Sequence, residues 1–268
     1  MARARDYMLS MRLIPGLTPL LVCLALTPHR AAAATELAYT LYALGLPIAD
    51  ATLGADLSAQ SYRISLTYRT VGLAELAIGG RLEQQAHGVF SGQAVLPKLF
   101  SSKARARGRD RVVSLSYRDE TPSIAAIHPP PETEREEVPA PLRVRTMDPL
   151  SKIAALLRRV AATGRCDGDA RDYDGRRLEV FQARTMGEET LPGSARSSFA
   201  GPALRCEFVS QILAGFRLGR DRNEDARPHG GIVWLAPVGT DGQRWPVRLE
   251  IETRWFGHAD IYLTGVTR

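Results

Sequence analysis

Residues 62–69 read YRISLTYR, and this alternation decides the fold class. Tyr62, Ile64, Leu66 and Tyr68 are apolar, and the residues between them are polar. Because successive side chains of a β-strand point to opposite faces, the pattern predicts a strand with one buried and one solvated face. Such strands are typical of antiparallel sheets, whereas strands of parallel sheets read as continuous apolar runs.

The same alternation recurs at residues 37–41, 49–57 and 247–252. Three pairs of turn-forming residues lie between extended segments: Gly79-Gly80, Asp174-Gly175 and Asp241-Gly242. These pairs accept the positive φ of tight hairpin turns. We therefore expect residues 35–268 to form a single α+β domain, mainly antiparallel, with a strongly curved sheet or open barrel.

One segment has helical spacing. Apolar residues recur every three or four positions from Leu150 to Ala161, Asp148 can cap the first turn, and Pro149 suits the first helical position. Gly164 is a typical helix end. The pattern predicts one principal helix over about 149–162, packed on the concave side of the sheet, although its apolar stripe is also suited to a partner.

Prolines bracket an acidic stretch within residues 129–141. This composition resists both strand and helix formation. We expect an exposed, mobile loop inside the single domain, and a linker between two halves is the alternative.

The first 34 residues read as a signal peptide that is cleaved from the mature protein. Positive charge comes first, at Arg3, Arg5 and Arg12. An apolar run over residues 13–26 follows, and Ala32-x-Ala34 supplies the small residues of a cleavage site. We expect cleavage before Thr35 and a periplasmic location.

The N-terminus has three other interpretations. Met11 is an alternative start to Met1. A membrane anchor is disfavoured because a spanning helix needs roughly 20 apolar residues, and this run is shorter and interrupted by proline. A lipid anchor on Cys23 is rejected, since Val22 stands where a small residue is required. The mature chain is expected to lack a transmembrane segment.

The net charge and the number of cysteines are consistent with an exported protein. Of 35 basic and 29 acidic residues, four basic and one acidic residue lie in residues 1–34, which leaves a net charge of +3. This balance gives no indication of a nucleic-acid partner. Loss of Cys23 leaves Cys166 and Cys206, which we expect to form a disulfide in an oxidising compartment. A reactive or metal-binding thiol pair is the alternative, with no CxxC spacing to support it.

One cationic stripe stands out, and its members occupy every second position: Lys103, Arg105, Arg107, Arg109 and Arg111. In an extended chain all five side chains would point to one side, forming a surface for an anion or a partner. The plainer interpretation is a solvated or edge strand that uses charge against aggregation, with a bulge at Gly108.

No catalytic or metal-binding motif is visible. Asp221 to Asp225 begin like a calcium loop, but Ala226 and Ile232 break the pattern. Gly193-Ser194 lacks the second glycine of a serine elbow. The mature histidines are scattered at His87, His128, His229 and His258. We therefore expect no metal, no cofactor and no enzymatic activity.

The order of several short motifs resembles the domain of unknown function family 3108. The motifs are Tyr39-x-Leu41-x-x-x-Gly45-Leu46-Pro47-Ile48-Ala49, Asp148-Pro149-Leu150-Ser151, Asp174-Gly175-x-Arg177 with a cysteine on either side, and Trp245-Pro246-Val247-Arg248. The resemblance covers most of residues 37–266. It implies an exported bacterial protein and supplies no catalytic residues.

Three functions remain open. The first is a non-enzymatic periplasmic module that binds an envelope component or partner protein through the stripe. The second is a half-barrel carrier of a lipid or other apolar ligand, by analogy of fold alone. This carrier requires a continuous cavity, which Trp234, Trp245 and Trp255, with Phe256 and Tyr262, could line, and plain core packing of these aromatics is the favoured alternative. A concave side filled by Leu150, Ile153, Leu157 and the tryptophans would exclude the carrier. The third is an enzyme whose residues are distant in sequence.

Overall fold

The computed structural model describes residues 34–239, 242–253 and 257–267, and in these ranges the strands form one antiparallel sheet of 13 strands. Two meanders, β1 to β7 and β8 to β13, are joined by pairing of β1 with β13. The strands are β1 (Thr35–Ala43), β2 (Leu46–Leu57), β3 (Ser61–Thr70), β4 (Arg81–Ser91), β5 (Ala94–Ala106), β6 (Arg109–Arg118), β7 (Thr121–His128), β8 (Gly168–Tyr173), β9 (Leu178–Leu191), β10 (Gly201–Ala214), β11 (His229–Pro237), β12 (Arg244–Thr253) and β13 (Gly257–Thr267).

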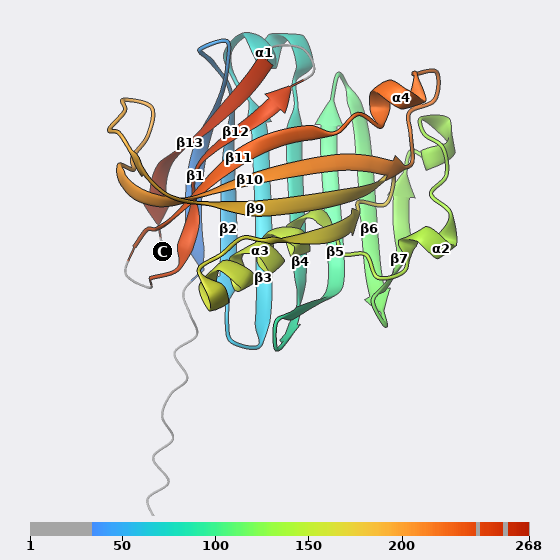
Figure 1. Cartoon of the computed structure of the whole chain (residues 1–268). Helices are drawn as coiled ribbons and strands as arrows, with labels where there is room; N and C mark the ends of the chain where they lie inside the picture. The colour runs from blue at the N-terminus through green and yellow to red at the C-terminus, as the bar shows by residue number, and fades with distance from the viewer. Residues whose placement is uncertain (1–33, 240–241, 254–256, 268) are drawn as a thin grey trace, which may run out of the picture. The chain divides into compact units, whose positions relative to one another are not determined.

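The segments in which apolar and polar residues alternate form strands with one buried face. In β3, Tyr62 and Ile64 are buried while Arg63 and Arg69 are exposed. The mainly antiparallel architecture is confirmed, and the sheet is open, with β7 and β8 at its two ends. In Figure 1 the strands β9 and β10 cross in front of β2 to β6, so the two halves of the sheet face one another.

The longest described helix, α3 (Pro149–Thr163), begins and ends where the sequence indicates. The carboxylate of Asp148 accepts hydrogen bonds from the backbone amides of Leu150 and Ser151, and Gly164 ends the helix with φ of 69°. The helix contacts β3, β4 and β5 in one half of the sheet and β8 and β12 in the other. Its residues Ala154, Leu157 and Val160 are buried in the main apolar core.

Turn chemistry was predicted correctly at one connection and wrongly at another. Asp174-Gly175 joins β8 to β9, and the Asp174 carboxylate accepts hydrogen bonds from the amides of Arg176 and Arg177. Between β3 and β4, however, a short helix, α1 (Gly72–Ile78), replaces the expected tight hairpin, and Gly79 ends that helix with φ of 56°. Asp241 lies outside the described residues.

The Pro- and Glu-rich segment is hydrogen-bonded to the rest of the domain, and it is exposed only in part, because Val138 within it is buried. It contains a 3-10 turn (Pro131–Thr133) and the helix α2 (Ala140–Arg143). The amide of Glu136 donates to the carbonyl of Phe216 at 2.8 Å, and the carbonyl of Glu134 accepts from the amide of Leu218 at 3.0 Å. Backbone pairing with the connection that also holds α4 (Arg222–Asp225) supplies the order that the composition did not indicate.

The strands and helices belong to one compact unit, Ala32–Arg268. In the described part of the chain, none of the helices has the length and apolar character that a membrane-crossing helix needs. The expected signal peptide falls almost wholly outside the described residues.

Candidate functional site

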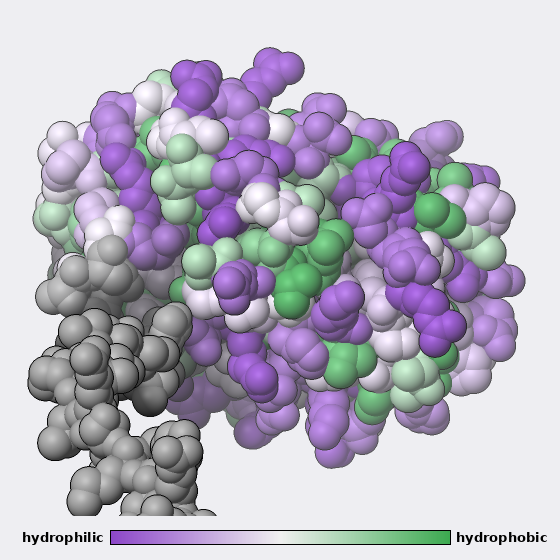
Figure 2. All heavy atoms as spheres, turned by 90° about the horizontal axis from the view of Figure 1, so that it is seen from below, coloured by the Kyte–Doolittle hydropathy of each residue, from purple (hydrophilic) through white to green (hydrophobic). Residues whose placement is uncertain are grey.

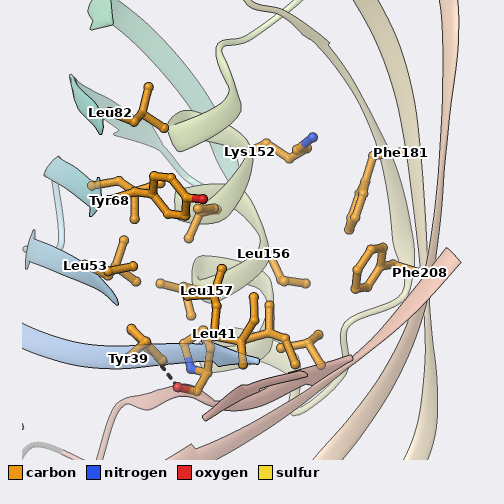
Figure 3. A pocket seen from close by; sticks show the side chains of 17 residues that line it. Tyr39, Leu41, Leu53, Tyr68, Leu82, Lys152, Leu156, Leu157, Phe181 and Phe208 are labelled. Carbon is orange, nitrogen blue, oxygen red and sulfur yellow. Dashed lines mark hydrogen bonds between the residues drawn. The ribbon is translucent and has the colours of Figure 1, made fainter. Parts of the chain in front are cut away.

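An apolar cavity of about 320 Å³ lies between α3 and the two halves of the sheet. Figure 3 shows Leu53, Tyr68 and Leu82 on one side of it and Phe181 and Phe208 on the other. Nearly all of its lining side chains are hydrophobic: Tyr39, Leu41, Ala51, Leu53, Leu66, Tyr68, Leu82, Lys152, Ile153, Leu156, Leu157, Phe181, Phe208, Val233, Pro246, Leu249 and Ile261. The described concave side is therefore hollow here, and Ile153 and Leu157 line the space without filling it.

The strand and helix periodicities of the sequence explain which residues line the cavity. Residues two apart on a strand share a face, which brings Ala51 and Leu53 of β2 to the same wall. On α3, Ile153, Leu156 and Leu157 are three or four positions apart and face the cavity together. Tyr39 is positioned by its hydroxyl, which donates to the carbonyl of Pro246 at 2.8 Å.

The wall opposite these strands is aromatic. The rings of Phe181 and Phe208 are stacked, with centroids 5.5 Å apart. Gly231 on β11 provides the space for the Phe208 ring, because a Cβ atom at Gly231 would lie 2.4 Å from Cζ of Phe208. A glycine in a strand interior often marks such a close approach.

Lys152 is the one charged side chain among the described lining residues. Its ammonium nitrogen lies 2.7 Å from Oδ1 of Asp172 and 5.1 Å from the centroid of the Phe181 ring. Burial raises the pKa of Asp172, and the neighbouring Lys152 opposes that rise. Since its charge is already paired, Lys152 adds little polarity to the cavity.

The exposure of the lining residues changes along the strands. On β1 Tyr39 is buried and Leu41 is half-buried, and on β2 Leu53 is buried and Ala51 is half-buried. Val247 and Leu249 on β12, and Leu263 and Ile261 on β13, follow the same order. In each strand the more accessible residue is nearer the end of the sheet that carries the β1–β2 turn. Nearer that end Ala49 and Thr70 are buried again, so the more accessible lining residues lie midway along the strands.

A second cluster of chemical interest is enclosed between α3 and β3. Oγ of Ser151 donates to Oδ2 of Asp148 at 2.5 Å and lies 2.6 Å from the hydroxyl of Tyr62. Burial raises the pKa of Asp148 to about 6, against the opposing effect of its hydrogen bonds. The hydroxyl of Tyr117 is also buried, without a hydrogen-bond partner in the described chain. Because Asp148 and Ser151 have no exposed surface, the cluster serves the interior and gives a substrate no access.

The cationic stripe does not form one face. The chain reverses at Arg107-Gly108, and Arg105 pairs with Asp110 while Ala104 pairs with Arg111. Cross-strand partners share a face, so Lys103 and Arg105 point to one side of the sheet and Arg109 and Arg111 to the other. The premise of a single extended segment was wrong because Gly108 forms a hairpin turn and not a bulge.

Arg111 belongs to a cluster that fastens one end of the sheet to the docked segment. Its guanidinium donates to both carboxylate oxygens of Glu134, at 3.0 and 2.5 Å. Arg176, from the β8–β9 turn, lies 3.7 Å from the same carboxylate and donates to the carbonyls of His128 and Pro129. Side chains thus connect the regions of β7 and β8, which no strand pairing joins in the described sheet. Sequence reasoning missed this cluster because its members are far apart in the chain.

The expected disulfide between Cys166 and Cys206 is confirmed. The two sulfur atoms lie at bonding distance, with Cα atoms 6.3 Å apart, and both residues are buried. The bond links the residues just before β8 to β10.

The remaining sequence candidates do not meet at the cavity. Trp234 and Trp245 are buried in the core and do not line it, and Trp255 lies outside the described residues. Asp221 caps α4. Within the described residues, no three His, Cys, Asp or Glu side chains are grouped as a metal site would require.

Comparison with known proteins gives one match. A family model with the description "Protein of unknown function (DUF3108)" covers residues 38–264. No curated protein and no solved structure matches the chain.

Proposed function

This chain belongs to the DUF3108 family, and we propose that it is a non-enzymatic binding protein that shelters an apolar ligand, such as a lipid acyl chain, in the cavity between α3 and the sheet. The observation that carries the proposal is the hollow itself, because a core that served stability alone would be filled to the usual packing density. Ligand pockets are commonly about 300 to 1,000 Å³ and mostly apolar.

The chemistry of the lining selects the ligand class. Tyr39 already uses its hydroxyl, and Lys152 is paired with Asp172, so the lining offers few polar groups for orienting a polar substrate. Burial of each methylene contributes about 0.8 kcal/mol. A chain of about ten methylenes would gain about 8 kcal/mol before the costs of association are subtracted. That gain suits reversible binding of an acyl chain.

The proposal includes a periplasmic location. The apolar run over residues 13–26, the Ala32-x-Ala34 site and the paired cysteines support it. An aqueous compartment between membranes is a place where an acyl chain needs a protein to shield it from water.

The test compares two substitutions on neighbouring residues of β2. Ala51→Phe places a ring into the cavity, whereas Thr52→Phe places the same ring on the opposite face of the strand. The probe is cis-parinaric acid, whose fluorescence rises in an apolar site. We expect Ala51→Phe to weaken probe binding on the order of 10-fold, since filling the space excludes part of the chain, and Thr52→Phe to leave it unchanged.

Native mass spectrometry of protein purified from cells provides a second measurement. A co-purifying lipid that is lost in Ala51→Phe and kept in Thr52→Phe supports the proposal. Equal probe binding by both variants, or no binding by the unmodified protein, contradicts it.

A further inference from the structure

We propose that one end of the sheet docks on an anionic membrane surface. This rim comprises three segments: the β1–β2 turn with the start of β2 (residues 44–47), α1 (Gly72–Ile78) and the β5–β6 turn (Arg107-Gly108). This inference goes beyond the binding of a ligand in the cavity, and it can be tested without one.

Backbone hydrogen bonds make the rim continuous. The amide of Val71 donates to the carbonyl of Ile48 at 2.9 Å, which holds the start of α1 against β2. The amide of Arg107 donates to the carbonyl of Ile78 at 2.7 Å, which holds the β5–β6 turn against the end of α1. Segments separated by about 30 residues in the chain therefore present one surface, at the top of Figure 1.

The rim displays large apolar side chains that are more than half exposed. Leu73 and Leu76 of α1 are 74% and 86% exposed, and Leu44 and Leu46 of the adjacent turn are 77% and 57% exposed. Leu73 and Leu76 are three positions apart and lie on one side of α1. None of the residues of α1 is buried, so its leucines do not support the core. Contiguous exposed apolar residues of this kind mark interaction surfaces.

The conformation of Leu44 adds to this argument. Its φ is 51°, in the left-handed region that suits glycine or asparagine better than leucine. A leucine here costs conformational energy and gains little burial in the domain. Insertion of the side chain into an apolar phase outside the protein would recover that cost.

Charge on the rim favours a membrane over other apolar partners. Three arginines in or beside the rim are paired with carboxylates: Arg69 with Asp50, Arg81 with Glu75 and Arg105 with Asp110. Arg107 and Arg109 are exposed and form no ion pair in the part of the chain that the structure describes. Exposed leucines flanked by unpaired cations are typical of proteins that insert into the headgroup region of anionic lipids.

The rim lies close to the wall of the cavity. Tyr68 of the lining lies 3.6 Å from where a Cβ atom of Gly80, two residues after α1, would stand. The opposite end, seen in Figure 2, has one central group of hydrophobic residues and several smaller ones among mostly hydrophilic residues.

A local reporter on α1 tests the proposal. Leu76→Cys, in a Cys23→Ser background that leaves the disulfide intact, is labelled with an environment-sensitive fluorophore. We expect a blue shift with vesicles of equimolar phosphatidylethanolamine and phosphatidylglycerol, and quenching by brominated acyl chains. Because the signal comes from position 76, binding through another part of the chain does not produce it.

The matched control carries the label at Leu99, which is 45% exposed on β5, eight residues from Arg107. Eight residues of strand span about 26 Å. This label should remain in a polar environment. Insertion at both positions would contradict docking through the rim.

Two sets of variants separate the apolar and ionic contributions. Leu73→Ser with Leu76→Ser should weaken vesicle binding on the order of 10-fold or more, through lost apolar burial. Arg107→Asn with Arg109→Gln should weaken binding to anionic vesicles on the order of 10-fold, because each cation near such a surface contributes about 1 kcal/mol. The same double variant should have little effect on binding to vesicles of phosphatidylcholine alone.

Other outcomes overturn the proposal. A label at Leu76 that stays polar with vesicles rules out insertion. A shift that rises with protein concentration and needs no lipid assigns the surface to a second copy, and a shift that only an added protein produces assigns it to a protein partner. Ligand binding in the cavity is measured separately with Ala51→Phe, so failure of docking and failure of ligand binding can be told apart.

Discussion

The hydroxyl of Tyr62 lies 2.6 Å from Oγ of Ser151, and this contact joins β3 to α3 in the interior. Ser151 in turn donates to Asp148, the residue that caps α3. One buried network therefore fixes the start of the helix, sets its position against the sheet and supports the helix that forms one wall of the cavity.

Tyr62→Phe removes only the hydroxyl from this network. We expect the free energy of unfolding to fall by about 1 kcal/mol, since Ser151 keeps its bond to Asp148 and only one hydrogen bond is lost. Urea denaturation provides the measurement. Tyr68→Phe on the same strand is the control, because the hydroxyl of Tyr68 makes no hydrogen bond within the described residues. An equal loss in both variants would contradict the role assigned to the contact.

Asp148→Asn should change how stability depends on pH. Burial raises the pKa of Asp148 from 3.8 to about 6, so the folded state binds a proton more tightly than the unfolded state. Its favourable contribution is full below pH 4 and is lost as pH rises through 6, by about 3 kcal/mol in total. Asparagine also caps helices and does not ionise.

We therefore expect Asp148→Asn to gain stability relative to the unmodified protein as pH rises from 4 to 7. Denaturation midpoints measured across this range give the difference directly. A difference that stays constant with pH would show that Asp148 is not the titrating group.

Glu134→Gln should have the opposite pH dependence. The hydrogen bonds from Arg111 lower the pKa of Glu134, so its contribution to stability is present at neutral pH and is lost as pH falls through the acid range. We expect a loss of about 2 kcal/mol at pH 7, the value typical of hydrogen bonds to a charged group, and a smaller loss below pH 4. Glu137→Gln, in an ion pair whose carboxylate is highly exposed, should change little.

Removal of the disulfide should be costly. Cys166 and Cys206 are 40 positions apart, and closure of a loop of that length contributes about 4 kcal/mol in the chain-entropy model. Cys166→Ala with Cys206→Ala should lower the free energy of unfolding by this amount in urea titrations. The unmodified protein should show the same loss when a reductant is added, and Cys23→Ser should show none.

Lys152→Met should destabilise the protein by leaving Asp172 buried without its partner. Loss of one member of a buried pair typically costs about 3 to 5 kcal/mol. Addition of Asp172→Asn should recover most of that loss, because the uncompensated charge is then gone. Lys98→Met, on an exposed position of β5, is the control. A double variant no more stable than Lys152→Met alone would show that the pair's charge is not the cause.

Several features could be predicted from local pattern. The alternation at residues 62–69 predicted β3, and Asp148 and Gly164 marked the ends of α3. Cys166 and Cys206 were paired correctly because no other cysteine remained after residue 34. Each of these inferences needs only spacing along the chain or a count of residues.

Other features depend on where the chain reverses direction and on contacts with residues far apart in the sequence. The spacing from Lys103 to Arg111 predicts one strand, because nothing local distinguishes a bulge from a two-residue turn at Gly108. The acidic segment before Pro139 looked mobile because its partners, Phe216 and Leu218, are some 80 residues away.

The sequence by itself determined the class of the protein: antiparallel strands with one apolar face, one long helix and one pair of cysteines. Only the tertiary structure decided that the apolar faces of β2 and β10 stand apart around a hollow, and that α1 and the β5–β6 turn meet at one end of the sheet. The physical reason is that periodicity reports which face of an element is apolar, while the distance between two such faces is set by the curvature of the sheet and by contacts between residues far apart in the chain.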